Sequence, residues 1–241
     1  MAKRQLLLLS SSKVHGFEFL EYAAQDVNEL LTRNKVSTVL FIPYALSNHD
    51  DYLKKVQIPF RKWGYKVEGI HQHEQPAEAV RQSQAIFIGG GNTFRLLKAL
   101  YDKQLIDPIR NRVLKHGIPY IGTSAGTNVA TRSINTTNDM PIVYPPSFEA
   151  LNLVPFNINP HYLDPEPDSK HKGETREERI LQYQEESTAH AVLALREGAS
   201  LYVEGTHASL KGISGARLFL KNHDPKEIEV DANLSYLLDL D

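Results

Sequence analysis

Short apolar runs recur along the chain, and within each run the apolar residues are consecutive rather than alternating. Five such runs occupy residues 6–10, 38–43, 85–88, 118–122 and 191–195. Continuous apolarity over this length is typical of strands that are covered on both faces, as in a parallel sheet. The pattern therefore predicts a buried, mostly parallel sheet.

Between these runs the apolar residues are spaced three and four apart, which is typical of helices with one buried face. Residues 20–31, 49–62 and 94–101 carry such patterns. Residues 107–117 predict a further helix, with Asp107 as its N-cap and Gly117 beyond its end. Alternating strands and helices predict one doubly wound α/β domain over residues 1–241, with helices on both faces of the sheet.

Composition limits the classes of protein to consider. The chain has 241 residues and 41% hydrophobic content, enough for a sizeable core. Its 27 basic and 29 acidic side chains give a net charge of -2, so we expect no nucleic-acid partner. Because the chain has no cysteine, thiolate nucleophiles, disulfides and thiolate-bound zinc are excluded.

No apolar segment is long enough for targeting or membrane insertion. The four leucines near the N-terminus are fewer than the roughly 7 to 15 apolar residues of a signal-peptide core. No other stretch approaches the roughly 20 residues of a membrane-spanning helix. We therefore expect a soluble, cytoplasmic protein with no membrane partner. Nothing in the sequence indicates an oligomeric state.

Residues 122–126 read Gly-Thr-Ser-Ala-Gly and match the G-x-S-x-G pattern. An apolar strand is predicted before them and a helix start after them, which is the setting of a nucleophile held in a strained turn between small neighbours. Ser124 is therefore a candidate nucleophile. Since short patterns also arise by chance, the alternative is that Ser124 only caps the following helix.

A serine nucleophile needs a general base and a group that orients the base. His161 follows an apolar stretch, so the end of a strand could present its ring to Ser124. Asp139 lies between the two along the chain. Both residue types more often have structural roles, and the residues alone leave these assignments open.

A second glycine cluster, residues 89–91, follows the apolar run 85–88. Its backbone N–H groups could cradle a phosphate, but the sequence fits neither G-x-G-x-x-G with a following acid nor a P-loop. The favoured interpretation is an oxyanion hole. Gly90 or Gly91 would donate one N–H and Ala125 the other, so the two glycine motifs would form one site.

Five motifs together resemble the peptidase E family of aspartyl dipeptidases, which are cytoplasmic serine peptidases. The likeness runs in the same order from the first predicted strand to at least residue 185. It implies an α/β sheet similar to that of the class I glutamine amidotransferases, and an enzyme that needs no metal or other cofactor. The motifs are FIGGGNTF, YIGTSAGTN, TTNDMPIV, NINPH and HKGETREERI.

The resemblance implies hydrolysis of dipeptides with an N-terminal aspartate, with Ser124 as nucleophile and His161 as general base. Asp139 is the favoured third member, because in the related cyanophycinases the acid also falls between serine and histidine. Glu197 is the alternative acid.

The resemblance also implies that Arg176 binds the side-chain carboxylate of the substrate, and a guanidinium can grip a carboxylate with two hydrogen bonds. Asn92 and Thr175 are further substrate-binding candidates. The alternative is structural, because residues 175–178 also read as a helix capping box, which would leave Arg176 on a solvated helix face.

Two other interpretations compete with the dipeptidase, and a metal site was also considered. A carboxylesterase of the α/β-hydrolase kind shares the G-x-S-x-G turn and the order of Ser, acid and His along the chain. A noncatalytic module could bind nucleotides or other small molecules through residues 89–93. His71 and His73 would face the same side of a strand, but no third ligand is nearby, so we expect no metal site.

Overall fold

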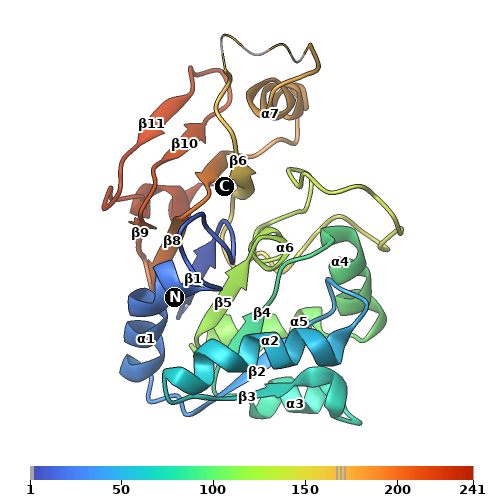
Figure 1. The fold of residues 1–241 in the computed structure, drawn as a ribbon. Coiled ribbons are helices and arrows are strands. Elements are labelled where there is room, and N and C mark those ends of the chain that lie inside the picture. The colour runs from blue at the N-terminus through green and yellow to red at the C-terminus, as the bar shows by residue number, and fades with distance from the viewer. Residues whose placement is uncertain (1–2, 167, 169, 171, 241) are drawn as a thin grey trace.

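The computed structural model describes residues 3–166, 168, 170 and 172–240. Its centre is a seven-stranded sheet with the strand order β3-β2-β4-β5-β1-β8-β9 (Figure 1). The five strands from β3 to β1 are parallel, and β8 is antiparallel to both of its neighbours. The strands are β1 (Gln5–Leu9), β2 (Thr38–Ile42), β3 (Lys66–Gly69), β4 (Ile86–Ile88), β5 (Tyr120–Thr123), β8 (Ala199–Glu204) and β9 (His207–Gly212).

Helices cover both faces of this sheet because successive strand residues point to opposite sides. In β1, Leu7 and Leu9 pack with α1 (Ala24–Arg33) and α2 (His49–Lys62). Leu6 and Leu8 belong to the core on the other face, which buries α3 (Pro76–Gln82), α4 (Thr93–Asp102) and α5 (Ile106–Arg110). The predicted doubly wound α/β class is confirmed.

A second, four-stranded sheet lies at one end of the molecule (Figure 1). Its order is β11-β10-β7-β6, with α7 (Arg176–Glu185) packed on it through Ile180 and Tyr183. The apolar run 191–195 forms β7 of this sheet, so it does not join the main one. The strands are β6 (Asn157–Tyr162), β7 (Val192–Arg196), β10 (Ala216–Phe219) and β11 (Lys226–Ile228).

The two sheets share one hydrophobic core. Leu193 and Leu195 of β7 are buried in the same cluster as Leu6 and Leu8 of β1. The second sheet is therefore packed against the first through apolar side chains, and the ends of β1, β6 and β7 come together at the junction.

Two local predictions were wrong. The helix predicted over residues 107–117 begins earlier, with Leu105 as N-cap, and continues as a π-helical turn, η3 (Asn111–Lys115). Asp107 instead lies in the first turn, where a carboxylate still interacts favourably with the helix dipole. The segment with His71 is a 3₁₀ turn, η2 (Ile70–Gln72), rather than a strand.

The remaining short elements are η1 (Glu21–Ala23), α6 (Ala125–Asn128) and η4 (Ser235–Asp239). Among the residues described above, no helix is both long and apolar enough to cross a membrane.

Candidate active site

Ser124 lies in the sharp turn between β5 and α6, with φ 51° and ψ −109°. A positive φ is uncommon for a residue with a side chain and signals backbone strain. Both flanking glycines are packed against backbone: an added Cβ on Gly122 would lie 2.6 Å from the Gly126 carbonyl oxygen, and one on Gly126 would overlap the Ile88 carbonyl oxygen. The sequence therefore folds locally into the turn that G-x-S-x-G predicts.

The side chains of Ser124, His161 and Glu197 form a hydrogen-bonded chain. His161 Nε2 is 3.0 Å from Ser124 Oγ, and His161 Nδ1 is 2.9 Å from Glu197 Oε1. With a proton on Nδ1 donated to the carboxylate, Nε2 is left as the acceptor for the serine hydroxyl. This is the relative arrangement of nucleophile, base and orienting acid in serine hydrolases.

The three residues come from different parts of the fold. Ser124 follows β5 of the main sheet, whereas His161 lies in β6 of the second sheet. Glu197 occupies the short turn that carries the chain from β7 in the second sheet to β8 in the main sheet. The site is thus assembled at the junction of the two sheets.

For the acid at His161, this geometry favours Glu197 over Asp139, the residue that the sequence favoured. Asp139 Oδ2 accepts a 2.7 Å hydrogen bond from the backbone N–H of Thr93, the first residue of α4. The carboxylate that reaches the histidine ring is that of Glu197, the alternative acid. Asp139 has the helix-capping role that is common for loop aspartates.

The glycine loop lies beside the candidate nucleophile. A Cβ added to Gly90 would be 3.1 Å from Ser124 Cβ, so the loop and the turn are in close contact. Burial raises the pKa of Tyr52 to about 12, and a hydrogen bond from the Gly90 backbone opposes this effect. Gly90, Gly91 and Ala125 remain the candidate donors of the predicted oxyanion hole, and the Gly91 and Ala125 N–H groups donate to no loop carbonyl among the described residues.

Arg176 is the first residue of α7, and the predicted capping box, from Thr175 to Glu178, is present around it. Thr175 Oγ1 accepts from the Glu178 backbone at 3.1 Å, and the Glu178 carboxylate accepts from the Thr175 backbone at 2.6 Å. Asn92 is likewise an N-cap: its Oδ1 accepts from the Arg95 backbone, and its amide donates to Met140 O. Asn92 and Thr175 are thus engaged in helix starts.

The guanidinium of Arg176 is half-buried and, in the part of the chain that the structure describes, forms no ion pair. Burial and then repulsion from Arg179 lower its pKa, whereas Asp139 raises it. Arg176 and Asp139 line the same cavity of about 190 Å³. A half-buried guanidinium without an ion-pair partner can bind a carboxylate ligand in this cavity.

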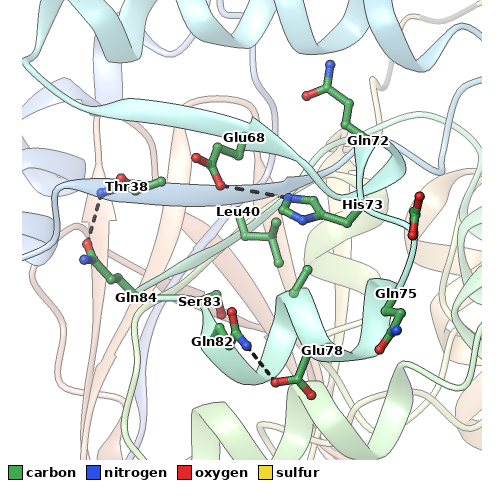
Figure 2. Close-up of a pocket in the computed structure, with 12 residues that line it drawn as sticks. Thr38, Leu40, Glu68, Gln72, His73, Gln75, Glu78, Gln82, Ser83 and Gln84 are labelled. Carbon is green, nitrogen blue, oxygen red and sulfur yellow. Dashed lines mark hydrogen bonds and ion pairs between the residues drawn. The ribbon is translucent and has the colours of Figure 1, made fainter.

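The two histidines considered for a metal have other partners. His71 Nε2 is 3.0 Å from Asp50 Oδ1, and His73 Nε2 is 3.9 Å from Glu68 Oε2. Figure 2 shows His73 and Glu68 on the wall of a cavity of about 620 Å³, which none of Ser124, His161 and Glu197 lines. No group of three or more His, Asp or Glu side chains suited to a metal is found among the described residues.

Comparison with known proteins identifies the family of the chain. The family model described as "Peptidase family S51" matches residues 6–211. The chain belongs to peptidase family S51. It is 55% identical to a "Probable alpha-aspartyl dipeptidase" of Drosophila melanogaster, with 98% of each chain covered. It is 50% identical to a "Peptidase E" of Streptomyces coelicolor, covering 98% of this chain and 95% of that one. The resemblance drawn from the five motifs is confirmed.

Two solved structures show the same fold. A putative peptidase E from Listeria monocytogenes matches with a TM-score of 0.67 and 24% identity, over 88% of this chain and 99% of that one. A peptidase from an acI-B1 Actinobacterium matches with a TM-score of 0.73 and 17% identity, over 97% of both chains.

Proposed function

We propose that this chain is a serine peptidase that hydrolyses dipeptides with an N-terminal aspartate. Membership of family S51 and the names of the full-length relatives support the substrate class. The observation that carries the chemistry is the unbroken hydrogen-bonded chain from Ser124 through His161 to Glu197.

In the proposed reaction, Ser124 Oγ attacks the carbonyl carbon of the aspartyl residue while His161 Nε2 takes the hydroxyl proton. Glu197 holds the ring through Nδ1–H and stabilises the imidazolium that forms. The oxyanion accepts hydrogen bonds from the Gly91 and Ala125 N–H groups. The imidazolium then gives its proton to the leaving amine, and the C–N bond breaks to leave an acyl-enzyme.

The second half of the reaction repeats these roles with water. His161 removes a proton from the attacking water, the ester bond to Ser124 breaks, and the serine recovers its proton from His161. Aspartate is released. In this proposal the steps use Ser124, His161, Glu197, two backbone N–H groups and one water molecule.

Arg176 is proposed to select the aspartyl side chain. Its half-buried guanidinium pairs with the substrate carboxylate, and an asparagine in the same place would leave the cation unpaired. Asn92 and Thr175 act indirectly in this proposal. They cap α4 and α7 and so fix the glycine loop and Arg176.

The test is an assay of purified protein on Asp-Leu, Asn-Leu, Glu-Leu, N-acetyl-Asp-Leu and a simple acyl ester, with Ser124→Ala as control. We expect cleavage of Asp-Leu alone among the peptides. Because rejection of glutamate depends on one methylene, worth roughly 1 to 3 kcal/mol, slow cleavage of Glu-Leu is compatible with the proposal.

Two results would contradict the proposal. Equal rates on Asn-Leu and Asp-Leu would remove the role given to Arg176. Ester hydrolysis without Asp-Leu cleavage would favour a carboxylesterase instead. An Arg176→Lys variant separates charge from shape, since lysine keeps the charge but loses the two-point grip.

A further inference from the structure

Ser10 immediately follows β1 and is completely buried at the junction of the two sheets. Its hydroxyl makes two hydrogen bonds to parts of the chain that are distant in sequence. Ser10 Oγ accepts from the backbone N–H of His161 at 2.8 Å and donates to the backbone carbonyl of Leu195 at 2.9 Å. One hydroxyl therefore joins the end of β1 to both β6 and β7.

Both contacts fall next to groups of the proposed triad. His161 carries the general base, and its φ of 54° is a conformation that the surroundings must maintain. Leu195 lies two residues before Glu197, which orients the ring. The Ser10 hydroxyl thus fixes the backbone of the base and of the segment that leads to the acid.

The backbone of the nucleophile, Ser124, is held by Leu9, the residue before Ser10. The backbone N–H of Ser124 donates to Leu9 O at 3.1 Å, and Thr127 Oγ1 of α6 donates to the same oxygen at 2.7 Å. The carboxyl end of β1 therefore contacts the segments of all three triad members. Because Leu9 contributes only its carbonyl, Ser10 is the side chain on which this arrangement depends.

We propose that Ser10 is a positioning residue that holds His161 and Glu197 in line with Ser124. The inference rests on the proposed triad. A serine hydroxyl can donate one hydrogen bond and accept another, so both partners are satisfied at once. Without the hydroxyl, a buried N–H and a buried carbonyl lose their partners, and the ring can shift relative to Ser124.

The test compares Ser10→Ala and Ser10→Cys with Ser200→Ala. Cysteine fills the space but hydrogen-bonds weakly, so it separates hydrogen bonding from packing. Ser200 is a matched control: it is completely buried, it lies opposite Leu9 in the sheet, and its hydroxyl has no partner among the described residues.

We expect both Ser10 variants to lower kcat on Asp-Leu about 10- to 100-fold, because small misplacements of catalytic groups have effects of this size. KM should change little, since Arg176 is untouched. Labelling of Ser124 by a fluorophosphonate, which also needs the base, should slow by a similar factor. Ser200→Ala should keep both rates. Thermal unfolding of all three variants separates these effects from a loss of folded protein.

Full kcat and labelling rate in Ser10→Cys would overturn the proposal, as would an equal loss in Ser200→Ala. The labelling experiment also separates this inference from the proposed function. If the wild-type protein reacts with the fluorophosphonate but cleaves no Asp-Leu, the substrate assignment fails while the Ser10 comparison still gives an answer.

Discussion

At the scale of single residues, the site depends on two strained backbones. Ser124 and His161 have φ values of 51° and 54°, and such conformations cost about 1 to 3 kcal/mol each. Hydrogen bonds from both backbone N–H groups to the end of β1 hold them in place. In these conformations His161 Nε2 lies 3.0 Å from Ser124 Oγ. The strained backbones therefore lower local stability but keep the nucleophile and the base in contact before substrate binds.

Removing the negative charge of each candidate acid should change kcat by a different amount. Glu197→Gln keeps a group of the same shape beside His161 but removes the negative charge, so kcat should fall by about 10³ to 10⁴. Asp139→Asn can still accept from the Thr93 N–H, and kcat should stay within an order of magnitude of the wild type. Steady-state kinetics on Asp-Leu checks both. A larger kcat loss in Asp139→Asn would reverse the assignment.

The residues of the site differ in how well the sequence predicts them. Ser124 stands in a motif whose local geometry can be inferred, and His161 follows an apolar stretch. The order along the chain favoured Asp139 over Glu197, whereas the geometry favours Glu197, because the loop that faces the ring is decided only when the two sheets pack. Ser10 gave no signal at all, since a buried serine after a strand is chemically unremarkable until its partners are known.

At the scale of elements, the turn between β5 and α6 is closed by contacts on both sides. Tyr120 Oη donates to Gly126 O at 2.6 Å, and Thr127 Oγ1 shares its one proton between Leu9 O at 2.7 Å and Gly122 O at 3.0 Å. Both donors are fully buried. The strand and the helix are therefore locked together around Ser124, which limits movement of the nucleophile.

The closeness of β5 and α6 makes Gly122→Ala a sharp test of the turn. Its Cβ would lie 2.6 Å from Gly126 O, so the elements must separate and displace Ser124. We expect a loss of about 1 to 3 kcal/mol in unfolding free energy and a lower kcat per folded molecule. Chemical denaturation and active-site titration measure the two effects.

Gly64→Ala is the control for that substitution. Gly64 has φ 90° with no atom near an added Cβ, so alanine there strains the backbone without touching the site. Its kcat should remain that of the wild type even where stability falls. Full activity in Gly122→Ala would show that the turn tolerates separation of the two elements.

Elements buried on both faces were the easiest to predict. The runs 6–10, 38–43, 85–88 and 118–122 correspond to β1, β2, β4 and β5, whose apolar residues are consecutive. Strands β8 to β11 were not predicted. Strands such as β8 and β9 include half-buried or exposed positions, so they lack a continuous apolar run. The division into two sheets arises from pairing between distant strands, which the period of a run does not encode.

At the scale of the whole molecule, activity requires that the second sheet keep its place against the first. An ionic network strengthens the second sheet next to Glu197. Arg196 binds Asp164 through Nε and Nη2 at 2.6 and 2.8 Å, and Glu227 through Nη1 and Nη2 at 2.6 and 2.9 Å. These contacts join the end of β7 to β11 and to the segment after β6.

This network predicts how stability depends on pH. Hydrogen bonds from Arg196 hold the pKa of Asp164 below its usual value of 3.8. A depressed carboxyl pKa stabilises the folded state above the unfolded pKa, and this contribution is lost as pH falls through the lower, folded value. Asp164→Asn should therefore lower unfolding free energy by a constant amount at neutral pH. The difference from the wild type should shrink only below about pH 4.

Because the Asp164 side chain is 44% exposed, we expect a difference of about 0.5 to 1 kcal/mol at neutral pH. Urea unfolding of both proteins from neutral pH to about pH 3 measures it. Asp102→Asn, which breaks only the exposed pair with Lys98, is the control for loss of one surface charge. A difference that already declines between about pH 7 and pH 5 would point to another titrating group, since Asp164 is fully ionised in both states over that range.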